Sequence, residues 1–204
     1  YAVSGGLHGV GASVVNALAE ELIVEVARDG EVFRQTYSRG KATSKLKKIG
    51  PAQRGQRGTT VSFSPDPEIF GKGAAFKAKT LYQMVRAKAY LIKDVELRWK
   101  CAAKHLPGDG SVPETETIHF ERGIEQYLEE ALGGRPTYTL KPFAGTHKFE
   151  GEGRVEWAVA WPGDEKGFCH SYVNTVPTPQ GGSHETGFRD VLEASGEYVW
   201  ETDL

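Results

Sequence analysis

The chain has 204 residues, of which 39% are hydrophobic, and its formal net charge at pH 7 is −2. A chain of this length can bury a substantial core, as one large domain or two small ones. The composition argues against a membrane-spanning protein or a disulfide scaffold. No apolar run reaches the roughly 18 residues needed to cross a bilayer, and the two cysteines, Cys101 and Cys169, form no C-x-x-C pair. We therefore expect a cytoplasmic protein without a zinc site.

A glycine cluster precedes the first predicted helix in the segment VSGGLHGVGASVVNALAEEL, residues 3–22. Apolar residues at helical spacing predict a helix that begins between His8 and Ser13 and continues to Leu22. A helix N-terminus favours an anion, and preceding glycines allow a phosphate to approach the main chain. The segment therefore predicts a phosphate-binding loop, with a plain connecting turn as the alternative. The order of Gly6, Gly9 and Gly11 matches neither a Walker A loop nor the dinucleotide fingerprint.

The following residues predict alternating strands and helices. Residues 23–28 and 32–37 form a predicted hairpin around Asp29-Gly30. The further predicted elements are a strand at 59–64, a helix at 74–91 with Met84 in the core, paired strands at 95–99 and 116–120, a helix at 124–132, a hairpin-like pair at 155–161 and 168–174, and a helix from Ser183. These elements indicate a mixed fold of helices and antiparallel sheets.

Residues 39–57 contain seven basic side chains and no acid: Arg39, Lys41, Lys45, Lys47, Lys48, Arg54 and Arg57. Such a stretch can contact the DNA backbone. The alternative, which we favour, is a solvated extension of the hairpin.

Three segments, in order, resemble one protein family: YAVSGGLHGVGASVVNAL at 1–18, RGTTVSFSPDPEIF at 57–70 and YVNTVPTPQGGSHETGFR at 172–189. They are similar to the ATPase subunits of bacterial type IIA DNA topoisomerases, the family of gyrase B and topoisomerase IV B, within the GHKL superfamily. The resemblance implies an α+β fold. Residues 1–133 would form the C-terminal part of a GHKL (Bergerat) ATPase domain, and residues 141–204 the start of a transducer domain like domain 2 of ribosomal protein S5. The segment RAKAYL, residues 86–91, is nearer to topoisomerase IV than to gyrase.

The resemblance also implies a nucleotide site for ATP with Mg²⁺. The lid from Gly6 to Ala12 would wrap the β- and γ-phosphates, Tyr1 would lie against the adenine, and Thr59 and Val61 would lie near the base. His8 would contact phosphate rather than act as a general base. The expected nucleotide-binding residues are Tyr1, Gly6, Leu7, His8, Gly9, Val10, Gly11, Ala12, Thr59 and Val61. The family supplies its catalytic glutamate and metal-binding asparagine from other segments, so we expect an internal fragment that does not hydrolyse ATP by itself.

The implied function is ATP-driven closure of a dimer of these ATPase subunits, coupled to DNA strand passage with the DNA-cleaving A subunit in a heterotetramer. The expected partners are DNA, the A subunit and a second copy, and no membrane. Two alternatives stay open: a GHKL ATPase in a chaperone or mismatch-repair protein, against which residues 172–189 argue, and a nucleic-acid-binding module with a structural glycine loop. We expect Gly181-Gly182 to form a turn with Ser183 as N-cap, serving either to pass on the nucleotide state or only to cap a helix.

Overall fold

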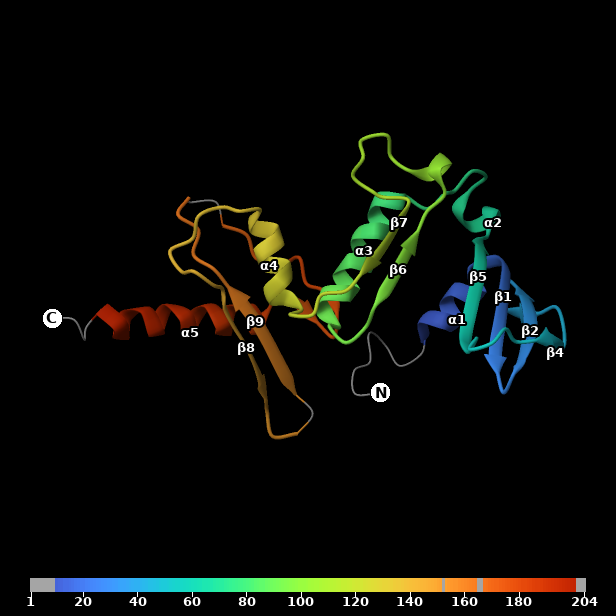
Figure 1. Ribbon diagram of the computed structural model, residues 1–204, viewed down its shortest axis with the longest axis horizontal. Coiled ribbons are helices and arrows are strands. Elements are labelled where there is room, and N and C mark those ends of the chain that lie inside the picture. The colour runs from blue at the N-terminus through green and yellow to red at the C-terminus, as the bar shows by residue number, and fades with distance from the viewer. Residues whose placement is uncertain (1–9, 152, 165–166, 201–204) are drawn as a thin grey trace. The chain divides into compact units, whose positions relative to one another are not determined.

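The computed structural model describes residues 10–151, 153–164 and 167–200 (Figure 1). The chain divides into two compact units, Tyr1–Ala75 and Phe76–Leu204. Both combine helices with antiparallel strands, which confirms the predicted α+β class. The boundary expected between residues 133 and 141 does not coincide with the division between these two compact units, and it stays a prediction.

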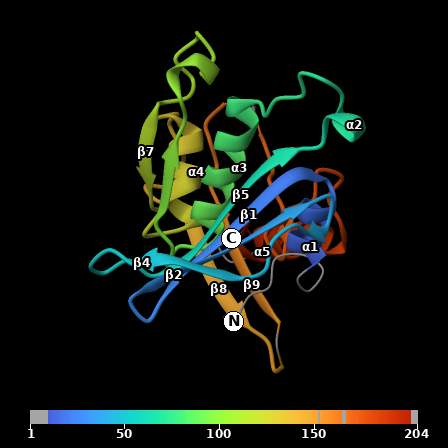
Figure 2. The same cartoon turned by 90° about the vertical axis from the view of Figure 1, so that its right-hand side faces the viewer.

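The first unit is an antiparallel sheet with the order β3-β2-β1-β5, and β4 also pairs with β2 (Figure 2). Helix α1 contacts β1 and β2. The elements are α1 (Val10–Ala17), β1 (Ala19–Arg28), β2 (Glu31–Ser38), β3 (Lys41–Ala42), β4 (Lys47–Pro51), β5 (Gly58–Pro65) and α2 (Pro67–Phe70). The predicted hairpin is confirmed, with Asp29 and Gly30 both at positive φ, as a two-residue turn of this kind requires.

The helix expected to reach Leu22 ends at Ala17, so that part of the prediction is wrong. Ala19 and Leu22 keep helical spacing, and the chain alternates only from Ile23 onward. Pairing with β2 and β5 nevertheless makes residues 19–28 a strand, with an irregular register between Ala19 and Glu21. Ala19 and Leu22 are buried in the sheet. Glu20 and Glu21 consequently lie on a strand rather than on later turns of the helix.

The second unit contains three two-stranded antiparallel sheets, β6-β7, β8-β9 and β10-β11, with helices beside them (Figure 1). Its elements are α3 (Ala78–Leu91), β6 (Leu97–Lys100), the short 3₁₀ helix η1 (Ala103–His105), β7 (Thr115–Ile118), α4 (Ile124–Leu132), β8 (Phe143–Lys148), β9 (Arg154–Val159), β10 (Tyr172–Val173), β11 (Val176–Pro177) and α5 (Ser183–Trp200). A buried cluster of Ala89, Tyr90, Ile118 and Phe120 joins α3 to β7.

The predicted pairing of 95–99 with 116–120 is confirmed, and so are the bounds of α4, which ends at Gly133 in the left-handed conformation. Two predictions are wrong. Residues 155–159 pair with β8, and the expected pairing of 155–161 with 168–174 does not form. The sequence did not reveal this partner, because β8 is polar, contains a glycine and carries no strong strand signal of its own. Met84 is 57% exposed and therefore does not fill the core.

Candidate functional site

The first turn of α1 is formed by Val10, Gly11 and Ala12, and all three are exposed. A Cβ built on Gly11 meets no atom within 4 Å, and its φ is not positive. Among residues 10–151, 153–164 and 167–200, neither packing nor backbone geometry requires a glycine at this position. A glycine here leaves the main chain open at a helix N-terminus, which favours an anion. Tyr1, Gly6, Leu7, His8 and Gly9 lie outside the described residues.

Thr59 and Val61 lie on β5, opposite Val26 and Val24 of β1. Both are exposed, Val61 to 52%. Helix α1 leads through Leu18 directly into β1. Strand β1 pairs with β5, which carries the residues expected near the base. The structure thus places the described part of the predicted site on neighbouring elements of one unit.

Asp66, together with Arg39, which the sequence placed only in the basic stretch, holds the junction of α1 and β1. The Asp66 backbone N–H donates to the Leu18 carbonyl at 3.0 Å, and the Arg39 N–H donates to the Ala19 carbonyl at 2.8 Å. The Arg39 guanidinium also donates to both carboxylate oxygens of Asp66, whose side chain is 2% exposed. These bonds hold the pKa of Asp66 below its usual value, with the Glu68 N–H adding to the effect. Asp66 also caps α2 through the Glu68 N–H, and the Pro-Asp-Pro sequence at the end of β5 is the signal that could have indicated this cap.

The basic stretch forms β3, β4 and their connections. Its side chains Lys41, Lys45 and Lys47 are exposed, whereas Arg39 pairs with Asp66 and Lys48 with Glu31. Exposed lysines are compatible both with a solvated hairpin extension and with contact to DNA, so the two interpretations stay predictions.

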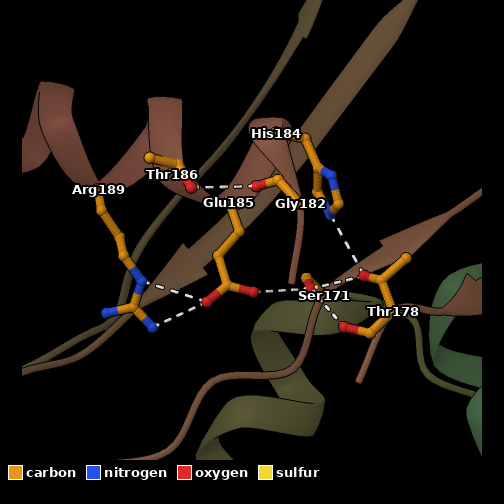
Figure 3. Close-up of polar contacts among 7 residues, drawn as sticks. All are labelled: Ser171, Thr178, Gly182, His184, Glu185, Thr186 and Arg189. Atoms are coloured by element: carbon orange, nitrogen blue, oxygen red, sulfur yellow. Dashed lines mark hydrogen bonds and ion pairs between the residues drawn. The ribbon is translucent and has the colours of Figure 1, made fainter. Parts of the chain in front are cut away.

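In the second unit, a polar network surrounds the first turn of α5 (Figure 3). Glu185 lies at its centre and accepts from the Ser171 hydroxyl at 2.9 Å and from Arg189 Nε and Nη2 at 3.2 and 3.0 Å. These donors lower the pKa of Glu185. The Ser171 and Thr178 hydroxyls are 2.7 Å apart, and His184 Nε2 lies 3.3 Å from the Thr178 hydroxyl. The network borders a hollow of about 420 Å³.

Gly182 caps α5. Its carbonyl accepts from the backbone N–H groups of Glu185 and Thr186, both at 3.0 Å, while Ser183 is the first helical residue. The expectation that Ser183 is the N-cap is therefore wrong by one position. Gly181 has a φ of +70°, which confirms the tight turn before the helix.

A group of aromatic side chains attaches this network to the buried cluster of α3. The hydroxyls of Tyr90 and Tyr172 are hydrogen-bonded, the Tyr90 and Tyr127 rings stack at 3.9 Å, and the Tyr127 hydroxyl lies 3.1 Å from His170 Nδ1. Burial raises the pKa of Tyr90. These contacts leave no local signal in the sequence, because their partners are far apart along the chain.

Comparison with known proteins identifies the family. The family model described as DNA gyrase B matches residues 123–199. The chain is 48% identical over 197 residues to the B subunit of DNA topoisomerase 4 from Caulobacter vibrioides, covering 94% of this chain and 28% of that protein. The chain belongs to the family of B subunits of bacterial type II DNA topoisomerases. This confirms the resemblance of the three sequence segments.

Solved structures of this B-subunit family have the same fold. The 43K ATPase domain of Thermus thermophilus gyrase B, in complex with an aminocoumarin, is 33% identical with a TM-score of 0.77, over 96% of this chain and 51% of that one. The topoisomerase IV ATP binding domain of Francisella tularensis, in complex with a small molecule inhibitor, is 30% identical with a TM-score of 0.68, over 97% of this chain and 52% of that one. The fold is that of the GHKL ATPase domains of this family. The chain spans about half of these structures and under a third of the curated relative.

Among the described residues, no helix has both the length and the apolar composition needed to cross a membrane.

Proposed function

We propose that this chain is part of the ATP-binding and hydrolysing B subunit of a type II DNA topoisomerase. ATP binding closes a dimer of B subunits, and closure drives a DNA segment through a break made by the DNA-cleaving A subunit. The observation that carries the proposal is family membership, supported by the open first turn of α1 at Gly11. The proposal includes a cytoplasmic location and a role in chromosome segregation.

The nucleotide would lie against α1 and β5. Main-chain N–H groups of the lid hold the β- and γ-phosphates at the positive end of the helix dipole, and Thr59 and Val61 lie beside the base. The absent Cβ of Gly11 leaves room for a phosphate, so the residue present fits this group. Phosphoryl transfer also uses Mg²⁺. The described part of the chain has no group of three or more His, Cys, Asp or Glu placed to hold a metal, and we assign no Mg²⁺ ligand there.

The network around Glu185 would pass the nucleotide state toward the partner-facing half of the protein. Support comes from its position: it joins the start of α5 to β10 and, through Tyr172, to the cluster of α3. A plain helix-capping loop is the alternative, and the Gly182 cap gives that alternative its own support.

The experiment uses the full-length B subunit reassembled with the A subunit. We expect DNA relaxation or decatenation that requires ATP, and supercoiling only if the A subunit makes the enzyme a gyrase. ATP binding without any DNA topology change would favour a GHKL ATPase of another pathway. DNA binding without ATP binding would favour a nucleic-acid-binding module.

A further inference from the structure

The turn between β10 and β11 has an unusual backbone. Strand pairing of Val173 with Val176 leaves Asn174 and Thr175 as the two central residues, and both have positive φ, +48° and +66°. Asparagine adopts this conformation readily, but threonine is β-branched and adopts it rarely. A conformation of this kind persists only where surrounding contacts hold it.

Lys88 supplies such contacts from the last turn of α3. Its ammonium group donates to the Thr175 carbonyl at 2.6 Å and to the Thr175 hydroxyl at 2.9 Å. The two residues are 87 positions apart in the sequence, and this contact is partly buried. Hydrogen bonds from a charged donor are stronger than those between neutral groups. One lysine therefore binds both the carbonyl and the hydroxyl of the strained residue.

The base of the same hairpin connects to α5. The Thr178 N–H donates to the Ser171 carbonyl at 2.8 Å, and the Ser171 hydroxyl donates to Glu185 in the first turn of α5. The hairpin thus has α3 at its turn and α5 at its base. A displacement of α3 would therefore move the turn through Lys88, and the hairpin would transmit this movement to the start of α5 through Ser171 and Glu185.

We propose that Lys88 is a positioning residue that keeps the strained Asn174–Thr175 turn fixed to α3 and so couples the nucleotide state to the transducer segment. The inference rests on the proposed function, because it names the contact through which that function passes from one half of the protein to the other. Lys88 itself touches no nucleotide in this scheme. Its removal should therefore separate ATP turnover from strand passage.

The test uses the full-length B subunit with the A subunit, comparing Lys88→Met, Lys88→Arg and Lys79→Met. Lys79 is the matched control because it lies on the same helix, with its side chain 54% exposed and an ion pair to Asp109 at 3.6 Å. The quantities measured are the KM and kcat of ATP hydrolysis without DNA, and the number of DNA passages per ATP. We expect Lys88→Met to retain basal hydrolysis while passages per ATP fall by roughly five-fold or more, the range of typical coupling between sites. Lys88→Arg should recover part of the loss, and Lys79→Met should match the wild type.

Equal passages per ATP in Lys88→Met and Lys79→Met would overturn the proposal. If Lys88→Met yields too little folded protein, Thr175→Val decides in the same assay, because it keeps the β-branched shape and removes only the hydroxyl acceptor. An intermediate loss then supports the proposal, and wild-type coupling overturns it. A wild-type enzyme without ATP-dependent strand passage would instead refute the proposed function.

Discussion

Replacing Gly11 by alanine should stabilise the fold and weaken nucleotide binding. Gly11 lies in the first turn of α1, its φ is not positive, and a Cβ built there meets no atom within 4 Å. The methyl group therefore clashes with none of the described residues and causes no backbone strain. What remains is the higher helix propensity of alanine, a gain of about 0.5–1 kcal/mol in the free energy of unfolding.

The expected effect on ATP has the opposite sign. If a phosphate approaches the main chain at this position, the added methyl group obstructs it. A hydrogen bond to a charged group contributes about 1.5–3 kcal/mol. Loss of one such bond raises the Kd for ATP by roughly ten-fold to a hundred-fold.

The assay combines urea unfolding of the full-length B subunit with calorimetric titration of a non-hydrolysable ATP analogue. Gly187→Ala is the matched control, because Gly187 is also helical and a Cβ built there meets no atom within 4 Å. It should give a similar gain in stability with unchanged affinity. If Gly11→Ala also left the affinity unchanged, the glycine would not be there to admit a phosphate, and the reasoning would fail.

Three further predictions concern other contacts. Asp66→Ala should lower the thermal midpoint more than Asp66→Asn, because asparagine still caps α2 through the Glu68 N–H while both variants lose the ion pair with Arg39; equal midpoints would refute the capping role. Gly145→Ala should cost about 1–3 kcal/mol in urea unfolding, since its Cβ would lie 2.5 Å from the Trp157 ring, and a neutral result would show that the ring has room to move. The pKa of Glu185 is lower in the folded protein than in the unfolded chain, so the ionised carboxylate stabilises the fold. This stabilisation is fully present at pH values above the pKa of Glu185 in the unfolded chain, and it is lost as the pH falls through the pKa of Glu185 in the folded protein. The difference in urea midpoint between wild type and Glu185→Gln should therefore shrink as the pH is lowered from neutral through that native pKa, and a constant difference would contradict the ionised network.

Elements with a strong local signal were predictable. The hairpin of β1 and β2 follows from alternation on both sides of Asp29-Gly30, and α4 follows from its apolar spacing, Gly133 and the proline beyond. The end of α1 was not predictable, because Ala19 and Leu22 continue the helical spacing of the apolar residues before them. Pairing with β5 decided the matter, and that pairing joins segments far apart along the chain, such as Leu22 with Phe63.

The candidate site shows the same division. The sequence by itself determined the family. It also predicted a phosphate-binding loop before α1 and a tight turn before α5, because these features depend on residue types at short spacing. Only the tertiary structure decided that Arg39 and Asp66 hold the end of α1, that β8 and not 168–174 pairs with β9, and that Lys88 reaches Thr175. The first and the last of these contacts join residues far apart along the chain, whereas the β8–β9 hairpin joins nearby strands, of which β8 carries no strong strand signal. Their free energy arises from burial and hydrogen bonding after the chain has folded, and no local pattern records it.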